Sequence, residues 1–290
     1  MHDNPQVVST SFFALPRHRI VTLCGPDAAA FAQAQFINDV NAITPGQWQW
    51  SGWLTPKGRV IALFAVLKLD DHTLWLLLPD ADPMALTAQL QRFVFRSKLK
   101  IAADEQLQVG VRFAAPDGAR GNEVSVSEDG AVELDMGGDA GPRCLRIAAG
   151  DVVDEHVGSD LDWAAFDIEH GLPRLPASQI EQWTPQQLSL ERLRGFSVRK
   201  GCYPGQEIVA RTHFLGKAKR GLGLLEAEAA LVVSADVHAG DKAIGTVVAV
   251  ASVGQRHLGL AVLPLERESP VSTAGGMRVR EVPLKGGLAR

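Results

Sequence analysis

The sequence predicts an α+β fold that is divided into more than one domain and ends in a β-rich part. Its 290 residues are enough for two or three domains. Segments rich in β-branched and aromatic residues, which favour strands, alternate with a few segments of helical periodicity. After Gly216, short apolar segments are separated by glycine turns, a pattern typical of a small β-barrel-like domain.

The first half of the chain predicts a sheet with two helices. Residues 19–24 are rich in β-branched side chains, and Gly25-Pro26-Asp27 then gives a helix-start signal. Thr55–Gly58 is a turn signature that joins two strands into a hairpin, and the continuously apolar segment 74–78 predicts a strand buried on both faces. We expect strands at 19–24, within 41–58, at 59–69 and at 74–78, and helices at 28–36 and 84–95, the second with Met84, Leu86, Leu90, Phe93 and Val94 facing the core.

The second half predicts mostly short strands. We expect strands at 107–113, 124–134 and 144–148, short helices at 162–169 and 187–193, and barrel strands at 222–225, 231–233, 243–250 and 257–262. The glycine-rich segment 135–142 lacks the Lys-Ser/Thr pair that a phosphate-binding P-loop requires.

The composition predicts a soluble cytoplasmic protein. Hydrophobic residues make up 46% of the chain, and a net charge of −4 excludes the overall basic surface of a dedicated DNA-binding protein. The cysteines Cys24, Cys144 and Cys202 form no Cys-x-x-Cys pair, which suits free thiols in a reducing compartment. The N-terminal residues lack a signal-peptide pattern, and the apolar segments are too short to cross a membrane. The eight histidines show no His-x-x-x-His spacing, so we expect no bound metal.

A local basic cluster has two interpretations. Arg96, Lys98 and Lys100 follow Phe93 and Phe95, which would suit an anionic ligand or a nucleic acid. A solvated helix end or strand end explains the same residues. A second basic cluster, 217–220, precedes the predicted barrel.

The segment from Lys200 to Glu207, Lys-Gly-Cys-Tyr-Pro-Gly-Gln-Glu, concentrates reactive groups in a shaped loop. Its two glycines and one proline exclude a regular helix or a central strand. Arg199 and Lys200 lie close to Cys202 in the sequence, and such cations favour a thiolate. The alternative is a buried structural cysteine in a tight turn. His213 is the nearest histidine along the chain, but a cysteine–histidine hydrolase requires the two side chains to meet in space.

Trp163 and Glu169 are a second candidate for a ligand site. An indole offers a stacking face for a flat heterocycle, and a carboxylate can accept paired hydrogen bonds from the edge of a pterin or purine. The alternative is that Trp163 belongs to the core and Glu169 caps another element.

The octet Lys200–Glu207 resembles the signature of the YgfZ family, folate-binding proteins related to the aminomethyltransferase (T-protein) of the glycine cleavage system. In that signature, Lys-Gly-Cys-Tyr-x-Gly-Gln-Glu, Pro204 occupies the free position. Further stretches match in order, at 20–27, 35–40, 57–59, 168–173 and 185–190. The resemblance covers roughly residues 14–262.

The resemblance implies a ring of three domains around a folate site. Residues 12–46 and 108–214 would form one discontinuous domain, residues 47–107 an inserted α+β domain, and residues 215–290 the C-terminal β-barrel. The cofactor implied is tetrahydrofolate or a derivative. Trp163 would stack on the pterin, Glu169 would bind its edge, and His18 occupies the position of a second stacking tryptophan.

The resemblance also implies roles for the loop. Cys202 and Lys200 would carry the chemistry, and the remaining cofactor-binding residues would be Gly201, Tyr203, Gly205, Gln206, Glu207 and Arg211. The acidic pair that aminomethyltransferases need after the hairpin turn is replaced by Ala62 and Leu63. Apolar side chains cannot stabilise the charged amine of an aminomethyl intermediate, so we expect that activity to be absent.

The resemblance implies that the chain is a folate-dependent accessory protein that supports iron–sulfur enzymes, including tRNA-modifying enzymes, and we expect a functional thiol at Cys202. Two alternatives stay open: a tetrahydrofolate-dependent one-carbon transferase, and a non-catalytic tRNA- or protein-binding module that uses the basic clusters. The expected partners are folate, iron–sulfur enzymes and, through direct contact, tRNA. Whether the chain is itself an enzyme is not decided by the sequence.

Overall fold

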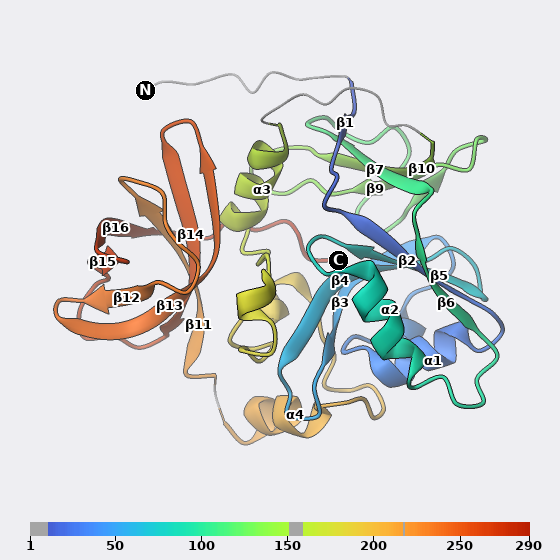
Figure 1. Ribbon diagram of the computed structural model, residues 1–290, viewed down its shortest axis with the longest axis horizontal. Helices are drawn as coiled ribbons and strands as arrows, with labels where there is room; N and C mark the ends of the chain where they lie inside the picture. Colours follow the sequence, from blue (N-terminus) through green and yellow to red (C-terminus); the bar gives the residue numbers. More distant parts are fainter. Residues whose placement is uncertain (1–10, 151–158, 217) are drawn as a thin grey trace.

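The computed structural model describes residues 11–150, 159–216 and 218–290. Their strands form two open sheets and one closed barrel, which lie around a central region crossed by α3 (Ser159–Glu169) and irregular segments (Figure 1). None of the helices in these residues is long and apolar enough to cross a membrane.

The first sheet is antiparallel and has the strand order β3-β4-β5-β2-β6. Its strands are β2 (Arg19–Cys24), β3 (Gln47–Leu54), β4 (Val60–Lys68), β5 (Thr73–Leu78) and β6 (Lys100–Asp104). The hairpin predicted around Thr55–Gly58 is present, since β3 and β4 pair along their length. The prediction of a strand buried on both faces at β5 is confirmed: Leu74, Leu76 and Leu78 enter one hydrophobic cluster and Leu77 enters another.

Two helices cover one face of the first sheet. These are α1 (Ala28–Gln35) and α2 (Pro83–Gln91), which pack Phe31, Ala32, Leu86 and Leu90 against the sheet. Asp82 caps α2 by accepting hydrogen bonds from the backbone N–H groups of Met84 (2.8 Å) and Ala85 (3.0 Å). The helix ends at Gln91, earlier than the predicted range 84–95. Met84, which was predicted to face the core, is 62% exposed.

The second sheet has the strand order β1-β7-β10-β9-β8. Its strands are β1 (Phe13–Ala14), β7 (Leu107–Arg112), β8 (Ser125–Val126), β9 (Val132–Asp135) and β10 (Cys144–Ala149). The predicted strand over 124–134 is divided in two because Ser127–Gly130 forms a turn, closed by a hydrogen bond from Gly130 N–H to the Ser127 carbonyl (2.9 Å).

The predicted C-terminal β-barrel is present and closed, in the order β11-β14-β13-β12-β15-β16. Its strands are β11 (Arg220–Ala227), β12 (Asp236–Ala239), β13 (Lys242–Val253), β14 (Arg256–Pro264), β15 (Thr273–Ala274) and β16 (Met277–Val282). The segment 231–233, predicted as a strand, is not one, and β12, β15 and β16 were not predicted because they are short or carry exposed polar residues.

The remaining helical segments are short and are joined by irregular structure. They are the 3₁₀ turns η1 (Val40–Ala42), η2 (Ala177–Gln179) and η3 (Leu190–Leu193), and α4 (Gln206–Phe214). The helix predicted at 187–193 is reduced to η3, which is bounded by left-handed residues at Ser189 and Arg194. The helix α4 was not predicted, because the glycine and proline content of the preceding loop dominated the pattern.

The domain division of the chain stays a prediction. In the first sheet, β2 pairs with both β5 and β6, so this sheet includes strands from both sides of the predicted boundary at residues 46/47. The barrel strands all lie within the predicted segment 215–290.

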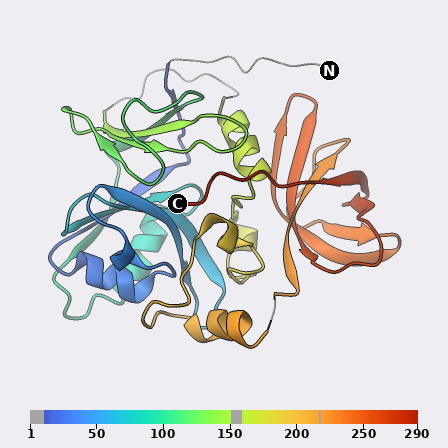
Figure 2. The same ribbon diagram turned by 180° about the vertical axis from the view of Figure 1, so that it is seen from behind.

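The last residues of the chain return from the barrel to the two open sheets (Figure 2). The indole N–H of Trp50 donates a hydrogen bond to the carbonyl of Leu288 (2.8 Å), and the Leu288 side chain is 2% exposed within the main hydrophobic cluster. Arg290 donates hydrogen bonds to the carbonyls of Asp135 and Gly137. This segment therefore ties the barrel to both sheets.

Replacement of Leu288 by alanine should lower the free energy of unfolding by about 2 to 5 kcal/mol, because a fully buried leucine loses its packing. Urea denaturation at neutral pH measures this change. The matched control is Leu265→Ala at a leucine that is 61% exposed, for which we expect a change within about 0.5 kcal/mol. Equal effects of the two substitutions would contradict the tying role of the C-terminal segment.

Candidate functional site

A cavity of about 690 Å³ lies where the two sheets, α3 and the barrel meet. Its wall combines the connection between β1 and β2, the start of α2, the first turns of α3 and the strand β13. The lining residues that carry charged or polar groups are Arg17, His18, Arg19, Asp80, Asp82, Asp160 and Arg174. Segments far apart in the sequence thus form one pocket, whose lining combines cations and carboxylates with apolar side chains.

His18 is the sequence-predicted residue that the structure brings to this cavity. Its side chain is buried, with 6% of the residue exposed, and its Nδ1 atom has no hydrogen-bond partner. Burial, assisted by the positive charge of Arg174, lowers the pKa of His18 well below its ordinary value. The imidazole is therefore neutral at neutral pH and has a free ring nitrogen.

A buried ion-pair network supports the wall beside His18. The carboxylate of Asp167 bridges Arg143 (2.9 Å) and Arg174 (2.6 Å), and Arg174 also reaches Asp80 at the end of β5 (3.4 Å). Burial alone would lower the pKa of Arg174, but Asp167 and Asp80 raise it overall. Burial raises the pKa of Asp80. Nε and both terminal nitrogens of Arg174 donate hydrogen bonds within the wall, to Asp167, Asp80 and the Pro79 carbonyl.

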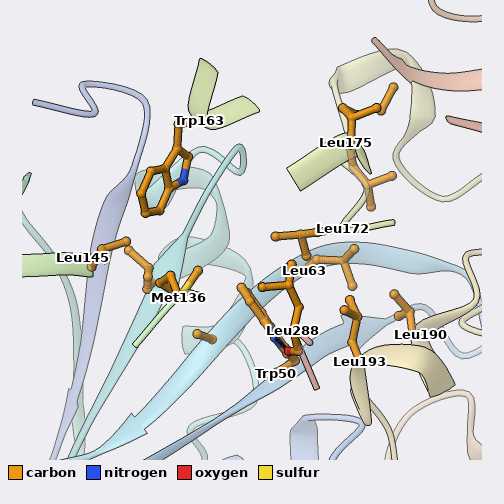
Figure 3. Close-up of a cluster of buried hydrophobic side chains, with 14 of the residues drawn as sticks. Trp50, Leu63, Met136, Leu145, Trp163, Leu172, Leu175, Leu190, Leu193 and Leu288 are labelled. Atoms are coloured by element: carbon orange, nitrogen blue, oxygen red, sulfur yellow. Dashed lines mark hydrogen bonds between the residues drawn. The ribbon is translucent and has the colours of Figure 1, made fainter. Parts of the chain in front are cut away.

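Trp163 lies behind this wall rather than in the cavity. Its side chain is fully buried, and the guanidinium of Arg143 lies 3.9 Å from the ring centre, with the Phe113 ring 5.8 Å away. Figure 3 shows Trp163 in the same buried cluster as Leu145 and Trp50. These contacts argue against the predicted stacking of a pterin on Trp163, because a ligand would have to displace Arg143.

Glu169 is engaged in a different part of the molecule. Its carboxylate accepts hydrogen bonds from Arg256 at the start of β14 and from Lys285 (2.9 Å), and its backbone carbonyl accepts one from Lys285 N–H (2.9 Å). Burial would raise the pKa of Glu169, but these two cations hold it below its usual value. The predicted role at a pterin edge is not supported, since both oxygens already bind α3 to the barrel and the C-terminal segment.

The loop that contains Cys202 is built against the tip of the β3–β4 hairpin. Gly205 has φ +80° and is the last residue of the loop, directly before α4. A Cβ atom at Gly205 would lie 2.6 Å from the Thr55 carbonyl oxygen, and one at Gly58 would lie 2.8 Å from Ile208 Cβ. Gly58 and Gly205, which have no Cβ, therefore allow the hairpin and α4 to approach closely. This explains the glycine in the turn signature Thr55–Gly58 and in the octet Lys200–Glu207.

Lys200 anchors the loop to α1. Its ammonium group donates hydrogen bonds to the carbonyls of Gln33 (2.6 Å), Phe36 (2.5 Å) and Asn38 (3.1 Å), at the negative C-terminal end of that helix. Burial lowers the pKa of Lys200 to about 8. These contacts give Lys200 a positioning role instead of the predicted catalytic one, because its donors are used to hold the loop.

The other residues of the loop divide into a buried anchor and an exposed surface. Tyr203 is 6% exposed, donates to the Ser197 carbonyl (3.4 Å) and has its pKa raised to about 12 by burial. Gln206 donates to the Lys200 carbonyl (3.4 Å). The residues at the surface are Gly201, Cys202, Glu207 and Arg211. The alternative of a buried cysteine is therefore wrong, since Cys202 is an exposed free thiol.

The loop and the cavity are separate places in the fold. None of the residues from Lys200 to Glu207, nor Arg211, lines the cavity. In both ribbon views α4 and the preceding loop lie at the lower edge, whereas α3, which lines the cavity, lies in the upper middle (Figures 1 and 2). The predicted set of cofactor-binding residues is thus split, and His18 is the member that lines the cavity.

The sequence did not identify Asp80, Asp160 or Arg174 as site residues. Arg174 directly follows Pro173 in a turn that the sequence singled out, which was the available signal. Asp80 and Asp160 are ordinary surface-type residues in the sequence, and only the meeting of three chain segments brings them together. Among the described residues, no group of three or more His, Cys, Asp or Glu side chains is arranged to hold a metal ion.

The sequence is 30% identical over 298 residues to the tRNA-modifying protein YgfZ of Klebsiella pneumoniae (strain 342), a match that covers 91% of this chain and 90% of that protein. The chain belongs to the YgfZ family. This confirms the resemblance predicted from Lys200–Glu207. No protein-family model matches the sequence.

The fold is that of an aminomethyltransferase. The chain matches the crystal structure of aminomethyltransferase T of the glycine cleavage system from Bartonella henselae with a TM-score of 0.72 and 14% sequence identity, covering 94% of this chain and 84% of the other. The predicted α+β, T-protein-like fold with a C-terminal barrel is confirmed. At this identity the likeness concerns the fold alone, so the site residues of this YgfZ-family chain are argued from its own geometry.

Substitution of the two loop glycines, Gly205 and Gly201, tests the packing of the loop against the hairpin. Gly205→Ala should lower the free energy of unfolding by about 1 to 3 kcal/mol, because the new methyl group meets the hairpin in a left-handed backbone conformation. The control is Gly201→Ala in the same loop, where a Cβ would meet no atom within 4 Å. Urea denaturation of both variants checks this, and a Gly201→Ala loss as large as that of Gly205→Ala would contradict the packing described.

Proposed function

We propose that this chain binds tetrahydrofolate or a derivative in the central cavity and acts in the cytoplasm as an accessory protein in tRNA modification, supporting iron–sulfur enzymes, with Cys202 as a functional thiol. A relative in the same family is named a tRNA-modifying protein, and the fold is shared with aminomethyltransferase T of the glycine cleavage system. Folate is favoured over other flat heterocycles because it is the ligand that the resemblance to the YgfZ family implies.

The observation that carries the proposal is the unpartnered, neutral His18 in the wall of the cavity. A buried ring nitrogen without a partner is costly and calls for an explanation. Because the Nδ1 atom itself is closed off, a ligand in the cavity would contact the imidazole ring rather than this nitrogen. The volume of about 690 Å³ falls within the range of about 300 to 1,000 Å³ that is typical of small-molecule sites.

The chemistry of the lining fits the two ends of a folate. A pterin presents a flat ring with N–H donors along one edge, and Asp160 offers a carboxylate. Within the described residues, this carboxylate accepts one hydrogen bond, from the neighbouring Leu161 N–H (2.9 Å). The benzoyl-glutamate end carries carboxylates, for which Arg17 and Arg19 supply cations on the same wall. His18 can stack on the ring through its imidazole. Asp160 therefore replaces Glu169 in the proposed site.

The one-carbon transferase alternative is not favoured. The positions of the acidic pair are taken by Ala62 and Leu63, which are 3% and 7% exposed and belong to two hydrophobic clusters of the first sheet. Neither side chain can orient or stabilise a charged amine. Folate then serves either as a bound ligand that regulates the accessory protein, or as the substrate of a reaction that does not depend on positions 62 and 63.

Cys202 supplies a thiol that partners can reach. It is exposed on a loop held by Lys200 and Gly205, so its position is defined although its side chain is accessible. A single thiol cannot hold an iron–sulfur cluster alone, since such clusters usually take about four protein ligands. The proposed role is a transient reaction or contact with an iron–sulfur client enzyme.

The folate site is tested by titration with tetrahydrofolate. His18→Ala should weaken binding at least about fivefold, the equivalent of one lost ring-stacking contact of about 1 kcal/mol, while His72→Ala, at an exposed histidine outside the cavity, should bind as the wild type does. Isothermal titration calorimetry under anaerobic conditions measures both. Unchanged affinity of His18→Ala would remove the cavity wall from the site, and absence of binding by the wild type would overturn the folate proposal.

The thiol is tested by complementation in cells that lack their own copy of the protein. Cys202→Ala should fail to restore the level of tRNA modifications made by iron–sulfur enzymes, because the accessible thiol is removed without disturbing the loop anchors. Cys24→Ala removes the other exposed thiol of the described residues and should restore them fully. Mass spectrometry of tRNA nucleosides is the readout, and full restoration by Cys202→Ala would refute the thiol mechanism.

A further inference from the structure

One surface of the molecule combines unpaired cations with a protruding aromatic ring. It consists of Arg92, Phe95, Arg96, Lys98 and Lys100, which follow α2 and lead into β6; we call it the basic–aromatic surface. All five residues are exposed, and Phe95 is 86% exposed, the highest value among the large hydrophobic side chains of the described residues. No carboxylate of the described residues lies within ion-pair distance of any of its four cations.

The basic–aromatic surface is held in a fixed shape. Asp27, at the start of α1, accepts a hydrogen bond from Lys98 N–H (2.6 Å). Gly25 approaches the same segment so closely that a Cβ there would lie 2.3 Å from the Lys98 carbonyl oxygen. Phe93 packs edge-on against the buried Trp53 with ring centres 5.8 Å apart. The backbone is therefore anchored on both sides of Phe95, while the ring of Phe95 itself remains exposed.

We propose that the basic–aromatic surface binds RNA at an unpaired nucleotide, with Phe95 stacking on the base and the four cations binding the flanking phosphates. An exposed aromatic ring among cations is the arrangement that single-stranded nucleic acid requires. A membrane surface would engage several protruding apolar side chains together. Here Phe95 protrudes among four charges, whereas Phe93, which is 39% exposed, packs edge-on against Trp53. The proposal rests on the proposed function only for the choice of tRNA as the RNA.

The position of the surface relates it to both parts of the candidate site. The first turn of α2 lines the cavity and its last residue precedes Arg92, a separation of about 13 Å at about 1.5 Å per residue. The helix α1 contacts Lys98 at its start and Lys200 at its end. In both ribbon views residues 92–99, α1 and the Cys202 loop lie along the lower edge of the molecule (Figures 1 and 2). An RNA on this surface would therefore lie on the same edge as the Cys202 thiol.

The test measures binding of the full chain to an unmodified tRNA transcript by fluorescence anisotropy at several salt concentrations. Phe95→Ala should weaken binding about fivefold or more, the loss expected for one stacked base. Phe214→Ala is the matched control, since this phenylalanine is 65% exposed on α4, and should change affinity less than twofold. Equal losses for the two variants would overturn the stacking role of Phe95.

The cations are tested through the salt dependence of the same binding. Joint replacement of Arg96, Lys98 and Lys100 by alanine should reduce the slope of log affinity against log salt by about 2, because three phosphate contacts are lost. The control replaces Arg120, in the connection between β7 and β8, and Lys242, in the barrel strand β13. Both are exposed cations, and their replacement should leave the slope unchanged. A smaller salt slope in the control variant alone would overturn the proposal. Binding of the wild type to anionic vesicles but not to tRNA would overturn it as well.

Failure of this proposal and failure of the proposed function give different results. The basic–aromatic surface shares no residue with the cavity lining, so Phe95→Ala and the joint replacement of Arg96, Lys98 and Lys100 should both keep the tetrahydrofolate affinity of the wild type. Loss of RNA binding with folate binding intact assigns the surface to RNA. A wild-type chain that binds RNA through Phe95 but does not bind folate would support the surface and overturn the folate site.

Discussion

The carboxylate of Asp167 is the contact on which the centre of the molecule depends. It lies in α3, is 1% exposed, and binds both Arg143 of the second sheet and Arg174, which continues to Asp80 of the first sheet. Removing one member of such a buried network leaves an uncompensated charge, which typically costs about 3 to 5 kcal/mol. The cavity wall is therefore a rigid junction between α3 and both sheets. Burial lowers the pKa of His18, and the nearby charges of Arg174, Arg143 and Arg19 lower it further, so that the imidazole is neutral.

The same junction explains why Trp163 is structural. Arg143 lies between the rings of Trp163 and Phe166, at 3.9 and 3.7 Å from their centres, and His170 stacks on the far side of Phe166 at 4.0 Å. A guanidinium that is fully buried needs both ion pairing and cation–π contact to remain charged, and burial lowers its pKa only to about 10. The indole thus stabilises the network that supports the cavity, instead of binding a ligand in it.

The sequence predicted elements whose signals are local. The strand β5 was predicted from its continuous apolar residues, the β3–β4 hairpin from its turn residues, and the family from Lys200–Glu207. It did not predict α4, because glycine and proline obscure a helix that starts at Gln206. It also joined Trp163, Glu169 and the Cys202 loop into one site, whereas the partners of each residue, such as Lys285 for Glu169 and Phe36 for Lys200, are distant in sequence and follow only from the fold. Periodicity and composition carry no information on such pairings.

The central claim is that a folate occupies the cavity beside His18 and that the Cys202 loop is a separate functional surface. The most direct measurement is a crystal structure of the protein with tetrahydrofolate bound. The account predicts a ligand that contacts His18 and Asp160, with the ring of Trp163 still covered by Arg143 and no contact to the loop of Cys202. A ligand stacked on Trp163, or bound against the thiol of Cys202, would contradict it.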